Sequence, residues 1–159
     1  MRRYPASVAL IATGEAPNRN GMTATAVCSL TATPPQMLVC MNAKSGTLLA
    51  LQKNKCFSIN VLQKEQCDLA GRFSSGDPKL CGDAKFEPSR WRQHSKGAPI
   101  LSDTSQSFVC RLNTCFEVGT HMIVVGFVLA VINETQEPAL LYEDGKFGAF
   151  EPETMLQSA

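Results

Sequence analysis

Residues 22–29 combine side chains that suit a strand in contact with a ligand. Alternate residues of a strand share a face, so one face of this segment carries mainly hydroxyl groups. That face consists of Thr23, Thr25, Val27 and Ser29. The opposite face is small and apolar, and it consists of Met22, Ala24, Ala26 and Cys28. A buried hydroxyl without a partner costs roughly 1–3 kcal/mol, so the first face should contact water or a hydrogen-bonding ligand.

A second polar segment, residues 42–47, leads into a helix expected over residues 45–54. Backbone N–H groups at a helix N-terminus attract anions, and Lys44 adds a positive charge. Together the two segments are compatible with a phosphate held at residues 44–47 and a flat polar ring along residues 23–29. From composition alone, a simpler interpretation is favoured, in which Ser45 is an N-cap and the threonines form a solvated strand face. The spacing does not match a P-loop, and no GxGxxG follows a predicted strand.

Length and charge limit the class of protein. The 159 residues suit a single domain spanning residues 1–159. The formal net charge is +1, from 15 basic and 14 acidic residues, which gives no support for a nucleic-acid or membrane partner. The N-terminal apolar stretch is too short for a signal peptide, and we interpret it as a first strand.

Seven cysteines occur in the chain, an odd number without CxxC spacing. Most of them lie in apolar runs, where a free cysteine behaves as a small buried hydrophobic residue. We therefore expect reduced core thiols in a cytoplasmic protein, with no disulfide framework and no metal site.

Short apolar runs rich in Val, Ile and Thr predict strands over residues 4–13, 22–30, 36–42, 55–62, 107–119 and 121–134. Besides the helix at 45–54, a second helix is expected to begin at Lys64 and end near Gly71. A tight turn at residues 117–121 and another at Asp144-Gly145 predict two hairpins. Residues 74–107 are too rich in Gly, Pro and Ser for one regular element, and Trp91 is expected to tuck under this loop. The pattern predicts a mainly β protein, a closed β-barrel with two minor helices.

Several ordered landmarks resemble the flavin reductase family, whose members have an FMN-binding split barrel. They are "RRYPASVALIAT", "NGMTATAVCSLTATPPQMLVCMNAKSGT", "FSINVL", "LAGRF", "GAPIL", "GTHMIVVGFVLAV" and "PALLY". The resemblance covers nearly the whole chain. It implies a homodimeric split β-barrel of Greek-key type with a few short helices, which binds FMN or FAD near the subunit interface.

The resemblance also implies roles for individual residues. The flavin ring and ribityl chain would lie along Met22 to Ser29. Asn60 would approach the cofactor, and Arg72 and Phe73 match the family's "RF" after the second helix. His121 matches the family histidine associated with the nicotinamide cofactor NAD(P)H, although "GTH" replaces the commoner "GDH". The phosphate side would be held by Asn42, Ala43, Lys44, Ser45 and Thr47.

The implied activity is hydride transfer from NAD(P)H to flavin, with reduced flavin passed to a partner oxygenase. The family's closing aromatic-Arg-Tyr segment appears here without its arginine, as "YEDGKFGAF". Two alternatives within the barrel group remain open: a flavin-binding electron-transfer module, and a reductase of iron or corrinoid cobalt. A third alternative is a barrel that binds another apolar ligand or serves as a structural dimer.

Overall fold

The computed structural model describes residues 3–133, 135 and 137–150. The expected domain of residues 1–159 therefore includes ends that lie outside the described residues. The strands are β1 (Ala6–Ser7), β2 (Ala9–Thr13), β3 (Asn20–Ala24), β4 (Val27–Ala32), β5 (Pro35–Asn42), β6 (Cys56–Val61), β7 (Trp91–Gln93), β8 (Pro99–Leu101), β9 (Gln106–Val118), β10 (His121–Ile132), β11 (Leu140–Glu143) and β12 (Lys146–Ala149). The helices are α1 (Gly46–Asn54) and α2 (Cys67–Ser74), with 3₁₀ turns η1 (Lys64–Gln66), η2 (Gly82–Lys85) and η3 (Pro88–Arg90).

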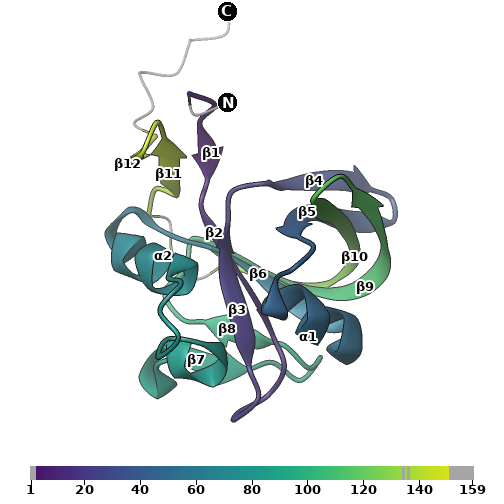
Figure 1. The fold of residues 1–159 in the computed structure, drawn as a ribbon. Coiled ribbons are helices and arrows are strands. Elements are labelled where there is room, and N and C mark those ends of the chain that lie inside the picture. The colour runs from purple at the N-terminus through teal and green to yellow at the C-terminus, as the bar shows by residue number, and fades with distance from the viewer. Residues whose placement is uncertain (1–2, 134, 136, 151–159) are drawn as a thin grey trace, which may run out of the picture.

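The main sheet is antiparallel, with strands in the order β3-β2-β6-β9-β10-β5-β4. Its edge strands β3 and β4 are consecutive in sequence and are joined only by Thr25 and Ala26. The sheet must therefore curl until its two edges approach each other (Figure 1). No ladder joins β3 to β4 in the described part of the chain, so the barrel is split rather than closed. The mainly β split-barrel class is confirmed.

Residues 22–30 do not form the single strand that their alternation predicts. β3 pairs with β2, from Asn20 to Ala24, whereas β4 pairs with β5 at the other edge of the sheet. The prediction is wrong because side-chain alternation shows that a segment is extended, but not which partner each half pairs with.

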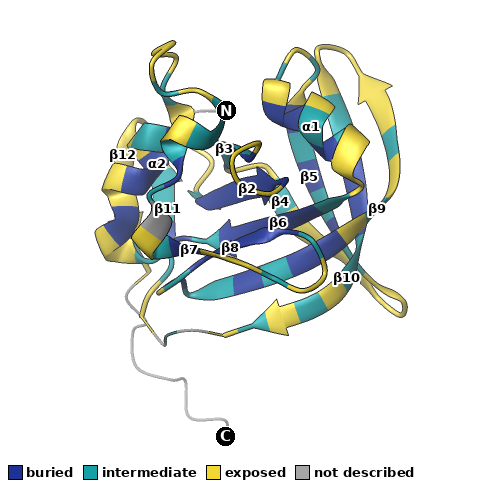
Figure 2. Cartoon of the chain, turned by 90° about the horizontal axis from the view of Figure 1, so that it is seen from below, coloured by how far each residue is buried: buried dark blue, intermediate teal, exposed yellow. Residues whose placement is uncertain are grey.

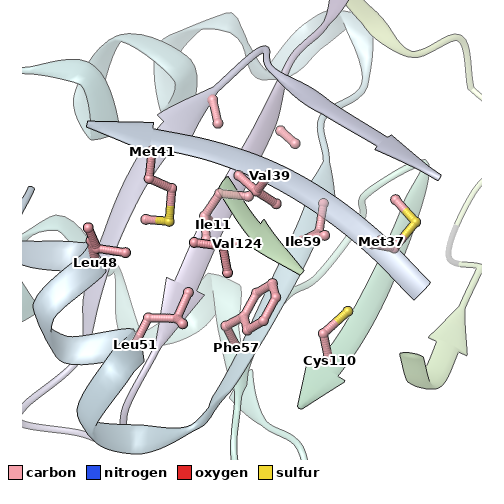
Figure 3. Packing of buried hydrophobic residues seen from close by; sticks show 12 residues of the cluster. Ile11, Met37, Val39, Met41, Leu48, Leu51, Phe57, Ile59, Cys110 and Val124 are labelled. Atoms are coloured by element: carbon pink, nitrogen blue, oxygen red, sulfur yellow. The ribbon is translucent and has the colours of Figure 1, made fainter. Parts of the chain in front are cut away.

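The interior of the barrel is filled by apolar side chains from the strands and from α1 (Figure 3). Along β5 the side chains alternate, and Met37, Val39 and Met41 are buried. Leu48 and Leu51 of α1 add to the same cluster. Each such side chain contributes about 1.5–3 kcal/mol when fully buried. Figure 2 shows β2 buried along its length, while β9 and β10 become exposed towards their ends.

A second cluster lies on the other face of β2, under α2. Phe73, Phe86 and Trp91 form its aromatic centre, with ring centroids 4.7–5.5 Å apart. The expectation that Trp91 is tucked in is confirmed. The helix expected to end near Gly71 continues to Ser74, because Phe73 in its last turn packs into this cluster.

The long segment 74–107 is not one regular element, as expected, and it contains η2, η3, β7 and β8. Both predicted hairpins are confirmed. Gly119 and Thr120 join β9 to β10, and Asp144-Gly145, both at positive φ, join β11 to β12.

All seven cysteines are free. Of those in apolar runs, Cys28 is exposed, so its predicted burial is wrong, and Cys40 and Cys56 are only half-buried; Cys67 and Cys81, outside those runs, are exposed. Cys110 is buried, and burial raises the pKa of its thiol to about 12. Among the described residues, no group of three or more His, Cys, Asp or Glu side chains is arranged to hold a metal ion. No helix there is long and apolar enough to cross a bilayer.

Gly126 allows β10 to pack closely on the core. A Cβ at this position would lie 2.6 Å from the ring of Phe57 and 3.0 Å from Cβ of Cys110. Gly126→Ala should therefore destabilise the fold by roughly 1–3 kcal/mol, measured by urea unfolding. Gly148→Ala is the matched control, because a Cβ there meets nothing within 4 Å. Equal unfolding midpoints for the two variants would contradict this account of the core.

Candidate functional site

The connection between β3 and β4 presents small side chains to solvent. Thr25, Ala26 and Cys28 are exposed, and so is Ser29. Residues 25–28 line a cavity of about 370 Å³ together with residues 4–7 and with two side chains of β5, Leu38 and Cys40. On the side of Thr25 and Ala26 the side chains are small and a flat ligand could approach the backbone, while Tyr4 and Leu38 supply larger surfaces on the other sides of the cavity.

The remaining residues of the predicted ligand-binding strand have other environments. The Thr23 hydroxyl donates to the carbonyl oxygen of Ala70 in α2, at 2.7 Å. Ala24 belongs to the barrel core, and Val27 packs against it. The predicted hydroxyl face is therefore divided: Thr25 and Ser29 are exposed, whereas Thr23 is half-buried and its hydroxyl is bonded to α2.

The segment before α1 is a tight turn anchored at both ends. Oδ1 of Asn42 accepts from the Lys44 backbone N–H at 2.9 Å, and the N–H of Ala43 donates to the Thr120 carbonyl. Ser45 is the N-cap residue, as predicted, but its hydroxyl makes no capping bond and instead contacts Sδ of Met22 at 3.4 Å. The first N–H groups of α1 are thus left uncapped by this side chain.

A cleft of about 260 Å³ opens at the N-terminus of α1. It is lined by β3 residues including Met22, by Ser45 and Thr47, and by part of the segment 75–85. Within the described residues, no protein group is hydrogen-bonded to the Thr47 side chain, although Thr47 is only 5% exposed. The structure therefore brings together the serine and threonine predicted for the phosphate side.

Sequence analysis missed two residues of this region, Lys85 and Arg19. Lys85 lines the cleft, and partial burial lowers the pKa of its ammonium group. Arg19 is 8% exposed, forms an ion pair with Asp83 at 2.6 Å and lies over the ring of Phe86. No local pattern marks either residue, because both act through contacts between segments far apart in sequence.

Arg72, Phe73 and Asn60 do not line the cleft in this structure. Arg72 donates to the carbonyl oxygens of Ala84 and Lys85, so it holds the segment that forms the wall. Phe73 is buried in the aromatic cluster. Asn60 is fully buried, and its amide donates to the Leu10 carbonyl while its oxygen accepts from Leu101 N–H and Ser107. Their environments are those of structural residues.

His121 is exposed at the start of β10, directly opposite Asn42 of β5 in the sheet register. Its Nδ1 lies 2.9 Å from the Thr120 hydroxyl. No group in the described part of the chain is hydrogen-bonded to its Nε2. The histidine is therefore adjacent to the turn before α1 and has one ring nitrogen available to a ligand.

The fold is a split barrel in which an exposed connection of small residues lies beside a helix N-terminus without a side-chain cap, where an anion is favoured. Comparison with known proteins identifies the family. The profile described as "Flavin reductase like domain" matches residues 1–151. This chain belongs to the flavin reductase family, as its sequence motifs indicate.

Individual relatives agree with this assignment. The chain is 34% identical to the FMN reductase (NADH) RutF of Variovorax paradoxus, over 92% of this chain and 80% of the relative. It is 35% identical to the reductase component of the FADH2-dependent resorcinol hydroxylase of a Rhizobium species, over 96% and 84%. The structure of the NADH:FAD oxidoreductase SgcE6 of Streptomyces globisporus superposes with a TM-score of 0.86 at 25% identity, over 96% of this chain and 90% of that one.

The Arg19–Asp83 pair ties the turn between β2 and β3 to η2. The Arg19 guanidinium donates to the Asp83 carboxyl and holds its pKa below the ordinary value of 3.8. Because the folded-state pKa is lowered, the pair stabilises the fold at neutral pH, and this contribution is lost as pH falls through the lowered pKa.

Asp83→Asn should accordingly destabilise the fold by about 1–2 kcal/mol at pH 7, measured by chemical unfolding. The difference from the natural sequence should shrink below the ordinary pKa of 3.8. Asp144→Asn, at an exposed hairpin turn, is the control. A difference that persists unchanged in acid would show that the charge on Asp83 is not its source.

Proposed function

We propose that this chain is an NADH-dependent flavin reductase, which transfers hydride to FMN or FAD and supplies reduced flavin to a partner oxygenase. The family assignment confirms the expected class of enzyme. Relatives named as an NADH-dependent FMN reductase and as a reductase component of a hydroxylase support the cofactors and the partner. One contact in this chain carries the proposal: Met22 of β3 contacts Ser45 at the α1 cleft. Because β3 leads into the exposed β3–β4 connection, this contact places the surface for the ring next to the cleft for the phosphoryl group.

The residues present fit a flavin nucleotide. The ring would lie along the exposed residues 25–29, where small side chains permit close approach to the backbone. The phosphoryl group would lie in the cleft at the α1 N-terminus, near Ser45 and Thr47. Uncapped N–H groups and the helix dipole favour a negative charge at this end. Asn42 and Ala43 would act by fixing the turn, and Lys44, which is exposed, by adding positive charge.

The flavin supplies the hydride acceptor, and the protein binds and orients the two nucleotides. No paired carboxylates or other acid–base group is required of the protein. His121 is the proposed orienting residue for the nicotinamide nucleotide. It lies at the start of β10, next to the turn before α1, and its Nε2 is available to a ligand.

Anaerobic mixing of the FMN-loaded protein with NADH tests the activity and the histidine together. We expect the visible flavin absorbance to bleach rapidly. His121→Ala should raise KM for NADH severalfold and leave the FMN Kd unchanged, while His94→Ala, the other histidine, should change neither. Failure of both NADH and NADPH to bleach bound flavin would favour the electron-transfer alternative, and normal kinetics for His121→Ala would remove this residue from the site.

We also propose that the protein is a homodimer. Large exposed apolar side chains are present on β4 and on the long β9–β10 hairpin: Leu30, Phe116, Val118, Leu129 and Val131. Two of them, Leu30 and Val131, line a cavity of about 430 Å³ whose other walls are mainly apolar and include Met37, Phe108 and Val128. Exposed apolar area of this kind marks an association surface, and a second copy of the chain offers the same surface.

Analytical ultracentrifugation should give a dimer for the natural sequence and a monomer for Val131→Asp. The substitution would place a carboxylate without a partner in the dimer interface, which is strongly unfavourable. Leu49→Asp, on the exposed side of α1, is the control and should remain dimeric. A natural protein that sediments as a monomer would contradict the proposal.

We also propose that the protein is cytoplasmic, because the seven cysteines are free thiols and reducing compartments keep thiols in that form.

A further inference from the structure

We propose that Lys85 is the cation that pairs with the phosphoryl group of the bound flavin and so makes the site selective for flavin nucleotides over riboflavin. This inference rests on the proposed function. It adds Lys85, from the irregular segment 74–107, to the residues proposed to bind the phosphoryl group at the α1 cleft.

The first argument is position. Lys85 lines the same cleft as Ser45 and Thr47 at the N-terminus of α1. Its Nζ donates to the carbonyl oxygen of Phe73 at 2.9 Å. An ammonium group has three donors, so two remain available. No carboxylate in the described residues forms an ion pair with Lys85, so its positive charge is available to an anionic ligand.

The second argument is rigidity. The backbone around Lys85 is fixed by two arginines from other parts of the fold. Arg72 donates to the carbonyl oxygens of Ala84 and Lys85 at 2.8 and 2.7 Å, and Arg19 holds Asp83 through two hydrogen bonds from its guanidinium. A lysine on a fixed backbone with an anchored Nζ loses less conformational entropy on binding than a free surface lysine.

The third argument is the charge around the cleft. Asp77 is the carboxylate residue lining it among the described residues, and Oδ1 of Asp77 accepts from the backbone N–H of Lys79 at 2.9 Å. The carboxylate is therefore partly engaged by its own turn. The same cleft also has the partial positive charge of the α1 N-terminus and the full charge of Lys85, so the cleft as a whole favours an anion.

The test compares two ligands that share a ring and differ in the phosphoryl group. Kd values for FMN and for riboflavin are measured by fluorescence quenching of the full-length protein. Lys85→Met should weaken FMN binding about tenfold or more, because a hydrogen bond to a charged group is lost, and should leave riboflavin binding unchanged. Lys79→Met is the matched control, since Lys79 is an exposed lysine of the same segment that does not line the cleft.

A second variant changes the charge in the opposite direction. Asp77→Asn keeps an oxygen for the turn and removes the negative charge, so it should tighten FMN binding and leave riboflavin binding unchanged. The proposal is overturned if Lys85→Met leaves FMN binding intact, or if it weakens both flavins equally, which would indicate a structural role. If the natural protein binds neither flavin, the proposed function itself fails.

Discussion

The structure depends on one covalent constraint, the short connection of Thr25 and Ala26 between two strands at opposite edges of the main sheet. Two residues cannot span a flat sheet of this width, so the sheet has to curl around its apolar face. That curling encloses the cluster around Val39, Met41 and Phe57 and places α1 at the edge of the barrel (Figures 1 and 3).

The same constraint creates the proposed site. At the crossing from β3 to β4 the chain leaves one ladder before it joins the other, and its small residues remain exposed. Met22, just before the crossing, contacts Ser45 at the start of α1. The proposed ring-binding surface and the proposed anion-binding helix terminus are therefore neighbours because the two edges of the curled sheet approach each other there, although more than twenty residues separate them in sequence.

The segment 75–87 shows how packing outside the barrel contributes to the site. Phe73, Phe86 and Trp91 form the apolar support, while Arg19 and Arg72 hold the backbone between them by charged hydrogen bonds. Neither arginine lines the α1 cleft. Their contribution is to hold residues 83–85, part of which lines the cleft together with Ser45.

Local patterns in the sequence were sufficient for the strand-rich class, for α1 and for both hairpins, since turn residues such as Asp144-Gly145 and side-chain alternation act within a few positions. The ordered motifs were sufficient for the family. Tertiary structure alone decided that residues 22–30 form two strands, that Asn60 and Phe73 are buried, and that Lys85 lines the same cleft as Ser45. These features depend on which distant segments pack together, and a pattern of neighbouring residues carries no information about that choice.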